Sequence, residues 1–178
     1  MKQIALLGMP NTGKSTLFNR LTGAHARVGN WPGITVELLA SKLLMGDQIV
    51  QLVDLPGIYD LGGYSEDERV VTTFLEQQRP DLMVLVMNSS QLDRQTTLLS
   101  ELLAFGIPIL VVLSMADEAK SLGIAIDEAG LSRDLGAPVC LLSAKYGHGM
   151  EHLREALKQA LAQPPRTITP PSPTELST

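Results

Sequence analysis

The segment Gly8-Met-Pro-Asn-Thr-Gly-Lys-Ser15 constrains the fold more than any other part of the chain. It matches the pattern G-x-x-x-x-G-K-[ST], a loop that leads from a strand into a helix and cradles phosphate groups. A short apolar run, Ile4–Gly8, precedes it, and a segment of helical period, Lys14–Thr22, follows it. The glycines let backbone amides turn inward around phosphate oxygens, and the helix N-terminus adds the positive end of its dipole. The pattern therefore predicts a phosphate-binding loop within an α/β domain.

Short apolar segments alternate with longer segments of helical period along the rest of the chain. Near-continuous apolar runs are typical of strands covered on both faces of a mostly parallel sheet. Gly46-Asp47 indicates a hairpin between two strands at an antiparallel edge. The alternation predicts an α/β fold with a six-stranded, mostly parallel sheet, one antiparallel edge strand and helices on both faces. The expected strands are Ile4–Gly8, Thr35–Met45, Gln48–Asp54, Leu82–Asn88, Ile107–Leu113 and Ala137–Leu142, and the expected helices are Lys14–Thr22, Ser65–Gln77, Gln91–Phe105, Asp127–Leu135 and Gly149–Ala162.

Composition limits the class of protein. A chain of 178 residues with 44% hydrophobic residues is sufficient for one domain, which we place at residues 1–162. Residues 163–178 contain five prolines and few apolar residues, which predicts an extended, flexible tail. A net charge of −5 argues against a nucleic-acid partner. The longest apolar stretch, Ile107–Ala116, is far shorter than the ~20 residues that span a bilayer, so we expect this segment to lie outside the membrane in the cytoplasm.

Several residues after the loop are candidates for nucleotide and metal chemistry. Lys14 is expected to reach the β- and γ-phosphates, and the Ser15 hydroxyl to bind Mg²⁺. Asp54-Leu-Pro-Gly57 follows a strand, where Asp54 would hold a water of the Mg²⁺ shell and the Gly57 N–H would face the γ-phosphate. The long connection Gly23–Thr35 is of a length typical of functional loops, and Thr35 is the expected second hydroxyl ligand of Mg²⁺.

Two later motifs predict the base. Asp117, in Ser114-Met-Ala-Asp117, can accept hydrogen bonds from N1–H and the amino group of guanine, a pattern that adenine does not offer. The Ala144 N–H, in Ser143-Ala-Lys145, can donate to O6 of guanine. Their order after the loop favours GTP over ATP. The predicted nucleotide contacts are Gly8, Met9, Pro10, Asn11, Thr12, Gly13, Lys14, Ser15, Thr16, Gly33, Thr35, Asp54, Gly57, Ser114, Met115, Asp117, Ser143, Ala144 and Lys145.

With these motifs assembled, the chain resembles the cytosolic G domain of FeoB-type ferrous-iron transporters. The resemblance rests on Gly8–Arg20, Val28–Glu37 and Asp54–Leu61, and more loosely on Asn88–Leu98. It implies a Ras-like P-loop GTPase fold and hydrolysis of GTP to GDP and phosphate. It also implies a membrane-embedded iron-transport region in the full-length protein, which would tether this cytoplasmic domain to the inner membrane.

The resemblance also implies a potassium ion at the site. Ile58 follows Gly57 where Ras-like GTPases carry the glutamine that orients the attacking water, and no arginine finger can be identified in the chain. The family implies instead a K⁺ ion held by the Asn11 side chain and by main-chain carbonyls around Gly29 and Trp31. A cation there could supply the charge that an arginine otherwise provides. The residues expected to act in catalysis are Asn11, Lys14, Thr35 and Gly57.

The chain departs from the family at two places. Ser114 stands where the base-reading loop normally begins with Asn, which predicts weaker guanine binding and tighter GDP binding in a Ser114→Asn variant. The proline-rich tail follows the last helix directly, where relatives continue into a helical subdomain. Two alternatives stay open: a stand-alone GTPase of tRNA modification or ribosome assembly, and a nucleotide-binding switch module with negligible hydrolysis.

Overall fold

The computed structural model describes residues 1–62, 65–114, 123, 127–143 and 149–162. Strands and helices alternate along these residues, except that three strands follow one another after the first helix; one short 3₁₀ turn lies at Leu92–Arg94. The strands are β1 Lys2–Gly8, β2 Arg27–Gly29, β3 Leu38–Met45, β4 Gln48–Asp54, β5 Leu82–Asn88, β6 Ile109–Ser114 and β7 Val139–Leu141. The helices are α1 Lys14–Thr22, α2 Glu66–Gln78, α3 Thr96–Leu103, α5 Glu128–Leu135 and α6 Met150–Ala162.

The strands form one sheet in the order β2-β3-β4-β1-β5-β6-β7. The pairs from β4 to β7 are parallel, and β2–β3 and β3–β4 are antiparallel. The mostly parallel sheet with an antiparallel edge is confirmed. The strand number differs from the predicted six, because Arg27–Gly29 pairs with Leu38–Ala40 and adds a seventh strand inside the segment expected to be a loop. Three residues without apolar alternation give too little sequence signal for such a strand.

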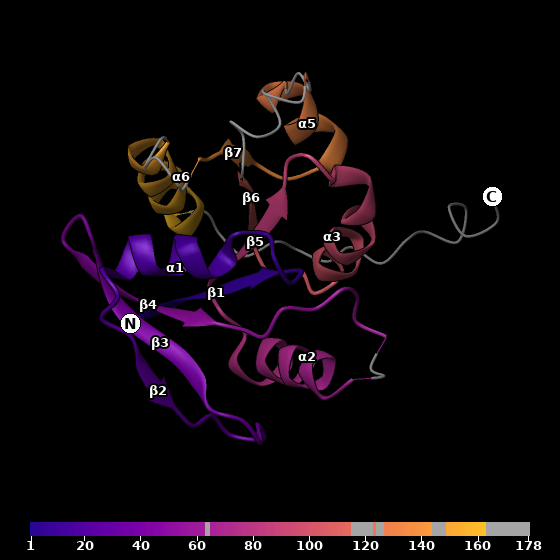
Figure 1. Cartoon of the computed structure of the whole chain (residues 1–178). Coiled ribbons are helices and arrows are strands. Elements are labelled where there is room, and N and C mark those ends of the chain that lie inside the picture. The colour runs from indigo at the N-terminus through magenta and orange to yellow at the C-terminus, as the bar shows by residue number, and fades with distance from the viewer. Residues whose placement is uncertain (63–64, 115–122, 124–126, 144–148, 163–178) are drawn as a thin grey trace.

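Helices cover both faces of the sheet (Figure 1). On one face, α1 and α6 pack on a cluster that includes Ile4, Leu17 and Leu153. On the other face, α2 and α3 pack on a second cluster, which includes Phe74 and Leu99. The central strands are buried on both faces, as their continuous apolar sequences predicted.

The predicted helix Gln91–Phe105 is interrupted. The structure has a 3₁₀ turn at Leu92–Arg94, and α3 begins only at Thr96. Gln95 lies between them and is almost fully buried, and its side chain bonds the Asn88 N–H and the carbonyls of Asn88 and Gln91. These hydrogen bonds fix Gln95 at the end of β5, and the α-helix begins only at the next residue, Thr96. The predicted tail lies outside the described residues, and no helix of the described part is both long and apolar enough to cross a membrane.

Candidate nucleotide-binding site

The loop between β1 and α1 is held tightly against the neighbouring strand. A Cβ added to Gly8 would lie 2.8 Å from the carbonyl oxygen of Val86 on β5, so no larger residue fits without a backbone shift. Asn11 and Gly13 both adopt left-handed backbone angles, with φ of 63° and 88°. Only glycine adopts that region without a steric penalty, although asparagine tolerates it better than most residues. The loop borders a cavity of about 500 Å³ lined by Met9, Pro10, Asn11, Gly13, Lys14, Ser15, Thr16, Gly57 and Asp67.

Lys14 is the buried cation of this cavity. Its ammonium group donates a short hydrogen bond to the Asp54 carboxylate and a second one, of 2.6 Å, to the Leu55 carbonyl. The side chains of Lys14 and Asp54 are only 10% and 17% exposed, so the pair is largely shielded from water. The first turn of α1 and the end of β4 are therefore joined by an ion pair at the cavity.

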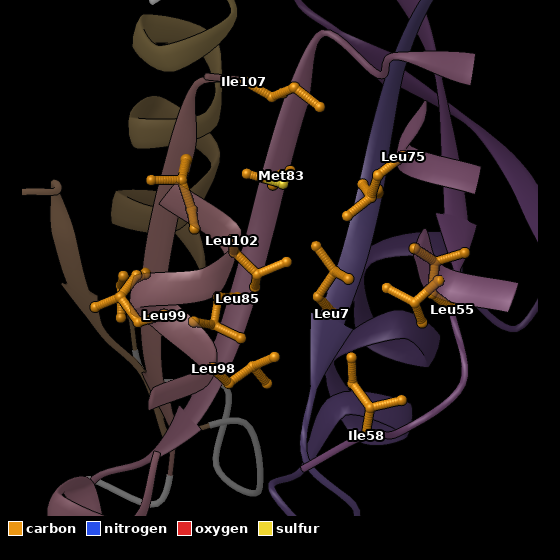
Figure 2. Close-up of a cluster of buried hydrophobic side chains, with 14 of the residues drawn as sticks. Leu7, Leu55, Ile58, Leu75, Met83, Leu85, Leu98, Leu99, Leu102 and Ile107 are labelled. Atoms are coloured by element: carbon orange, nitrogen blue, oxygen red, sulfur yellow. The ribbon is translucent and has the colours of Figure 1, made fainter. Parts of the chain in front are cut away.

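The segment after Asp54 packs directly on the loop. The Ile58 N–H donates to the Gly8 carbonyl at 3.0 Å, and a Cβ on Gly57 would lie 3.1 to 3.2 Å from three atoms of Pro10. The Ile58 side chain is 2% exposed and points into the core beside Leu7 and Leu55 (Figure 2). Ile58 is thus an anchor of this segment, and its side chain lies away from the cavity.

The segment 29–36 lies against α2. The Trp31 ring packs edge-on against Phe74, with ring centroids 5.3 Å apart, and the Thr35 hydroxyl donates to the Glu66 carboxylate at 3.1 Å. Thr35 is not among the residues that line the loop cavity. The predicted Mg²⁺ ligand Thr35 is therefore held by α2 in this conformation.

The residues predicted to hold K⁺ line two different cavities. Asn11 lines the loop cavity, whereas Gly29 and Trp31 line a separate cavity of about 650 Å³ beside β3. Gly33 has a φ of 76°, and its position lies next to Thr73 of α2. A common K⁺ site would require the segment 29–36 to move toward the loop.

The base-reading residues are described only in part. Ser114 ends β6, next to β5, and is 2% exposed; its hydroxyl bonds the carbonyls of Thr12 and Met87, the latter at 3.2 Å. The Ser143 hydroxyl is buried and has no hydrogen-bond partner among the residues that the structure describes. The predicted contacts Met115, Asp117, Ala144 and Lys145 lie outside the described residues.

Two polar residues at this edge of the sheet were missed by the sequence interpretation. Ser89 is 2% exposed and donates to the Ser114 carbonyl through both its hydroxyl and its N–H, at 2.7 and 3.1 Å. Gln95 is the buried residue that holds the end of β5. The available signal was the polar segment Asn88–Gln91 directly after the apolar run of β5, at the edge where parallel strands place ligand loops.

The geometry agrees with comparisons to known proteins. Residues 2–157 match the family described as Ferrous iron transport protein B. The Fe(2+) transporter FeoB of Synechocystis is 46% identical over 171 residues, which cover 96% of this chain and 28% of that protein. The chain therefore spans little more than a quarter of the length of this relative.

Solved structures of FeoB proteins are also similar to this chain. The cytosolic domain of the T. maritima FeoB iron transporter in a GDP form is 37% identical, with a TM-score of 0.86 over 94% of this chain and 67% of that one. The G domain of the same transporter is 38% identical, with a TM-score of 0.82 over 92% of this chain and 99% of that one. The chain belongs to the FeoB family of ferrous-iron transport proteins and has the fold of their P-loop G domain.

Proposed function

We propose that the chain binds GTP with Mg²⁺ in the cavity of the Gly8–Ser15 loop and hydrolyses it to GDP and phosphate. The observation that carries this proposal is the position of Lys14, a buried cation at the first turn of α1 that lines the same cavity as Ser15. A helix N-terminus and a lysine together favour a polyphosphate ligand. The family membership and the GDP form of the T. maritima relative support guanine as the base.

The donor set fits a magnesium ion. Mg²⁺ prefers oxygen ligands and retains several waters. Ser15 lines the cavity next to Lys14, and the Asp54 carboxylate bonds the Lys14 ammonium group. Ser15 would bind the ion directly and Asp54 through a water, with Thr35 joining once it leaves Glu66. When bound, Mg²⁺ would neutralise charge on the phosphates.

The remaining residues would position the nucleotide. Lys14 would exchange Asp54 for phosphate oxygens, and the N–H of Gly57, which lines the same cavity, would sense the γ-phosphate. Ile58 orients no water, because its side chain is buried in the core. Transition-state charge must therefore be offset by other groups, and we propose a K⁺ ion bound by Asn11 and by carbonyls around Gly29 and Trp31. This arrangement requires that the segment 29–36 leaves α2.

A hydrolysis assay tests both the proposed GTP hydrolysis and the proposed K⁺ site. We expect phosphate release from GTP to be faster in KCl than in NaCl, and Asn11→Ala to remove the difference between the two salts. Asn19→Ala is the matched control, because Asn19 is also an exposed asparagine but lies on the outer part of α1. Equal rates in both salts for the wild type would reject the K⁺ site. GTP binding without any hydrolysis would reject the proposed enzymatic activity and would favour the alternative of a nucleotide-binding switch module.

In the full-length protein, we propose that this domain regulates ferrous-iron transport through a membrane region to which it is tethered on the cytoplasmic side. The proposal rests on the FeoB relatives, of which this chain covers 28% or less. Iron uptake by cells that express the full-length protein should fall when Lys14 is changed to Ala. Unchanged uptake would contradict a regulatory role.

A further inference from the structure

A buried chain of hydrogen bonds joins the ends of β5 and β6 to the phosphate loop. Ser89 donates twice to the Ser114 carbonyl, and the Ser114 hydroxyl donates to the Thr12 carbonyl. All three residues are buried, with 2%, 2% and 3% of their surface exposed. The Thr12 hydroxyl adds an internal bond to the Met9 carbonyl at 3.0 Å.

The bond to Thr12 fixes the direction of the next amide. In a planar trans peptide, the carbonyl and the following N–H point in opposite directions. Because the Ser114 hydroxyl holds the Thr12 carbonyl toward β6, the Gly13 N–H must point the other way. Gly13 lines the loop cavity, so its amide is available to a ligand there.

The loop needs such an anchor from outside. Its residues Asn11 and Gly13 both have left-handed backbone angles, and a non-glycine residue in that region costs about 1 kcal/mol or more. The Ser114 hydroxyl has one proton, which it directs to Thr12 and also toward Met87, at 3.2 Å. Its single proton is therefore directed at the backbone, and none is left to donate to a nucleotide base.

We propose that Ser114 and Ser89 are positioning residues for the phosphates: Ser114 aims the Gly13 N–H at the nucleotide, and Ser89 holds Ser114 in place. The inference rests on the proposed binding of guanine nucleotides. It assigns to Ser114 a role at the phosphate end of the site, and it adds Ser89, which the motifs do not include.

The test compares three nucleotides by titration calorimetry with the full chain. Ser114→Ala should weaken GDP binding about two- to tenfold, the range expected for one net hydrogen bond. IDP, which lacks the guanine amino group, should lose the same factor, because the base contacts are unchanged. GMP should lose less than GDP, because it lacks the second phosphate.

Ser89 should act through Ser114. We expect Ser89→Ala to lose less affinity than Ser114→Ala, with the same relative losses for GDP, IDP and GMP. Ser89→Thr, which keeps the hydroxyl, should keep the wild-type affinity. The double variant should bind GDP no more weakly than Ser114→Ala alone. Ser90→Ala is the matched control, since the Ser90 hydroxyl donates to the neighbouring Asn88 side chain. Thermal unfolding of each variant identifies any that fail to fold. Ser114→Cys, which keeps a polar group that donates only weakly at a slightly larger volume, then replaces Ser114→Ala.

The outcomes separate the two proposals. An equal loss of affinity for GMP and GDP in Ser114→Ala, or a changed ratio of GDP to IDP affinity, would place Ser114 at the base and overturn the inference. Additive losses from Ser89 and Ser114 would overturn the role of Ser89. Failure of the wild type to bind GDP would instead reject the proposed function, and with it this inference.

Discussion

Asp54 should affect nucleotide binding in opposite directions with and without magnesium. In the structure it bonds Lys14, the residue that a nucleotide phosphate must engage. Asp54 therefore competes with phosphate for the lysine when no metal is present, and assists binding when it holds a water of the Mg²⁺ shell. Asp54→Asn preserves the shape of the side chain and removes its charge.

The magnitude follows from the bond that is weakened. Hydrogen bonds to a charged group contribute about 1.5–3 kcal/mol and neutral ones about 1, and the Asn oxygen still accepts from Lys14. The difference is about 1 kcal/mol, or roughly fivefold in a binding constant. Because Lys14 and Asp54 are only 10% and 17% exposed, solvent screening reduces this little.

The assay is the affinity for a fluorescent GDP derivative, measured in EDTA and in excess Mg²⁺. We expect Asp54→Asn to bind about fivefold more tightly than the wild type in EDTA and more weakly in Mg²⁺. Asp47→Asn, on the exposed hairpin turn, removes the same charge far from Lys14 and should change neither value. Weaker binding by Asp54→Asn under both conditions would refute the competition between carboxylate and phosphate.

Three further predictions concern other parts of the molecule. Burial, with a smaller effect of Glu128, raises the pKa of Cys140 to about 12, so iodoacetamide at pH 8 should label this thiol only after unfolding. The raised pKa stabilises the fold below pH 9, and this contribution should decrease as the pH rises from about 9 toward 12. Leu85→Ala, in the fully packed core, should lower the free energy of unfolding by about 2–5 kcal/mol in urea titrations, and a loss below 1 would contradict tight packing there. Trp31 is the only tryptophan, so its fluorescence should change when a non-hydrolysable GTP analogue and Mg²⁺ draw the segment 29–36 from α2, and should stay constant if that segment is fixed.

The fold could be predicted because local pattern and tertiary position agree for most of the chain. β4 and β5 have the predicted limits, and α1 begins and ends where its sequence indicates. The departures occur where tertiary contacts decide. β2 exists because Arg27–Gly29 pairs with β3, and the start of α3 depends on the buried Gln95 side chain. Neither contact has a periodic signal in the sequence.

The site could be predicted less completely, because a sequence motif identifies residues but does not give their side-chain conformations or contacts. The motif identified Lys14, but its ion pair with Asp54 and its bond to the Leu55 carbonyl required the structure. Thr35 was predicted as a metal ligand and bonds Glu66 in this conformation. Ser89 has no motif at all, because its role depends on the proximity of β5 and β6.

The most direct test of the central proposal is the conversion of GTP to GDP by the purified chain, measured by chromatography against a Ser15→Ala variant. The proposal predicts that the wild type forms GDP in Mg²⁺ and K⁺, that ATP is not converted, and that EDTA or the Ser15→Ala change abolishes the reaction. Equal turnover of ATP, or GDP formation no faster than in Ser15→Ala, would contradict the assignment of the Gly8–Ser15 loop as a GTPase site.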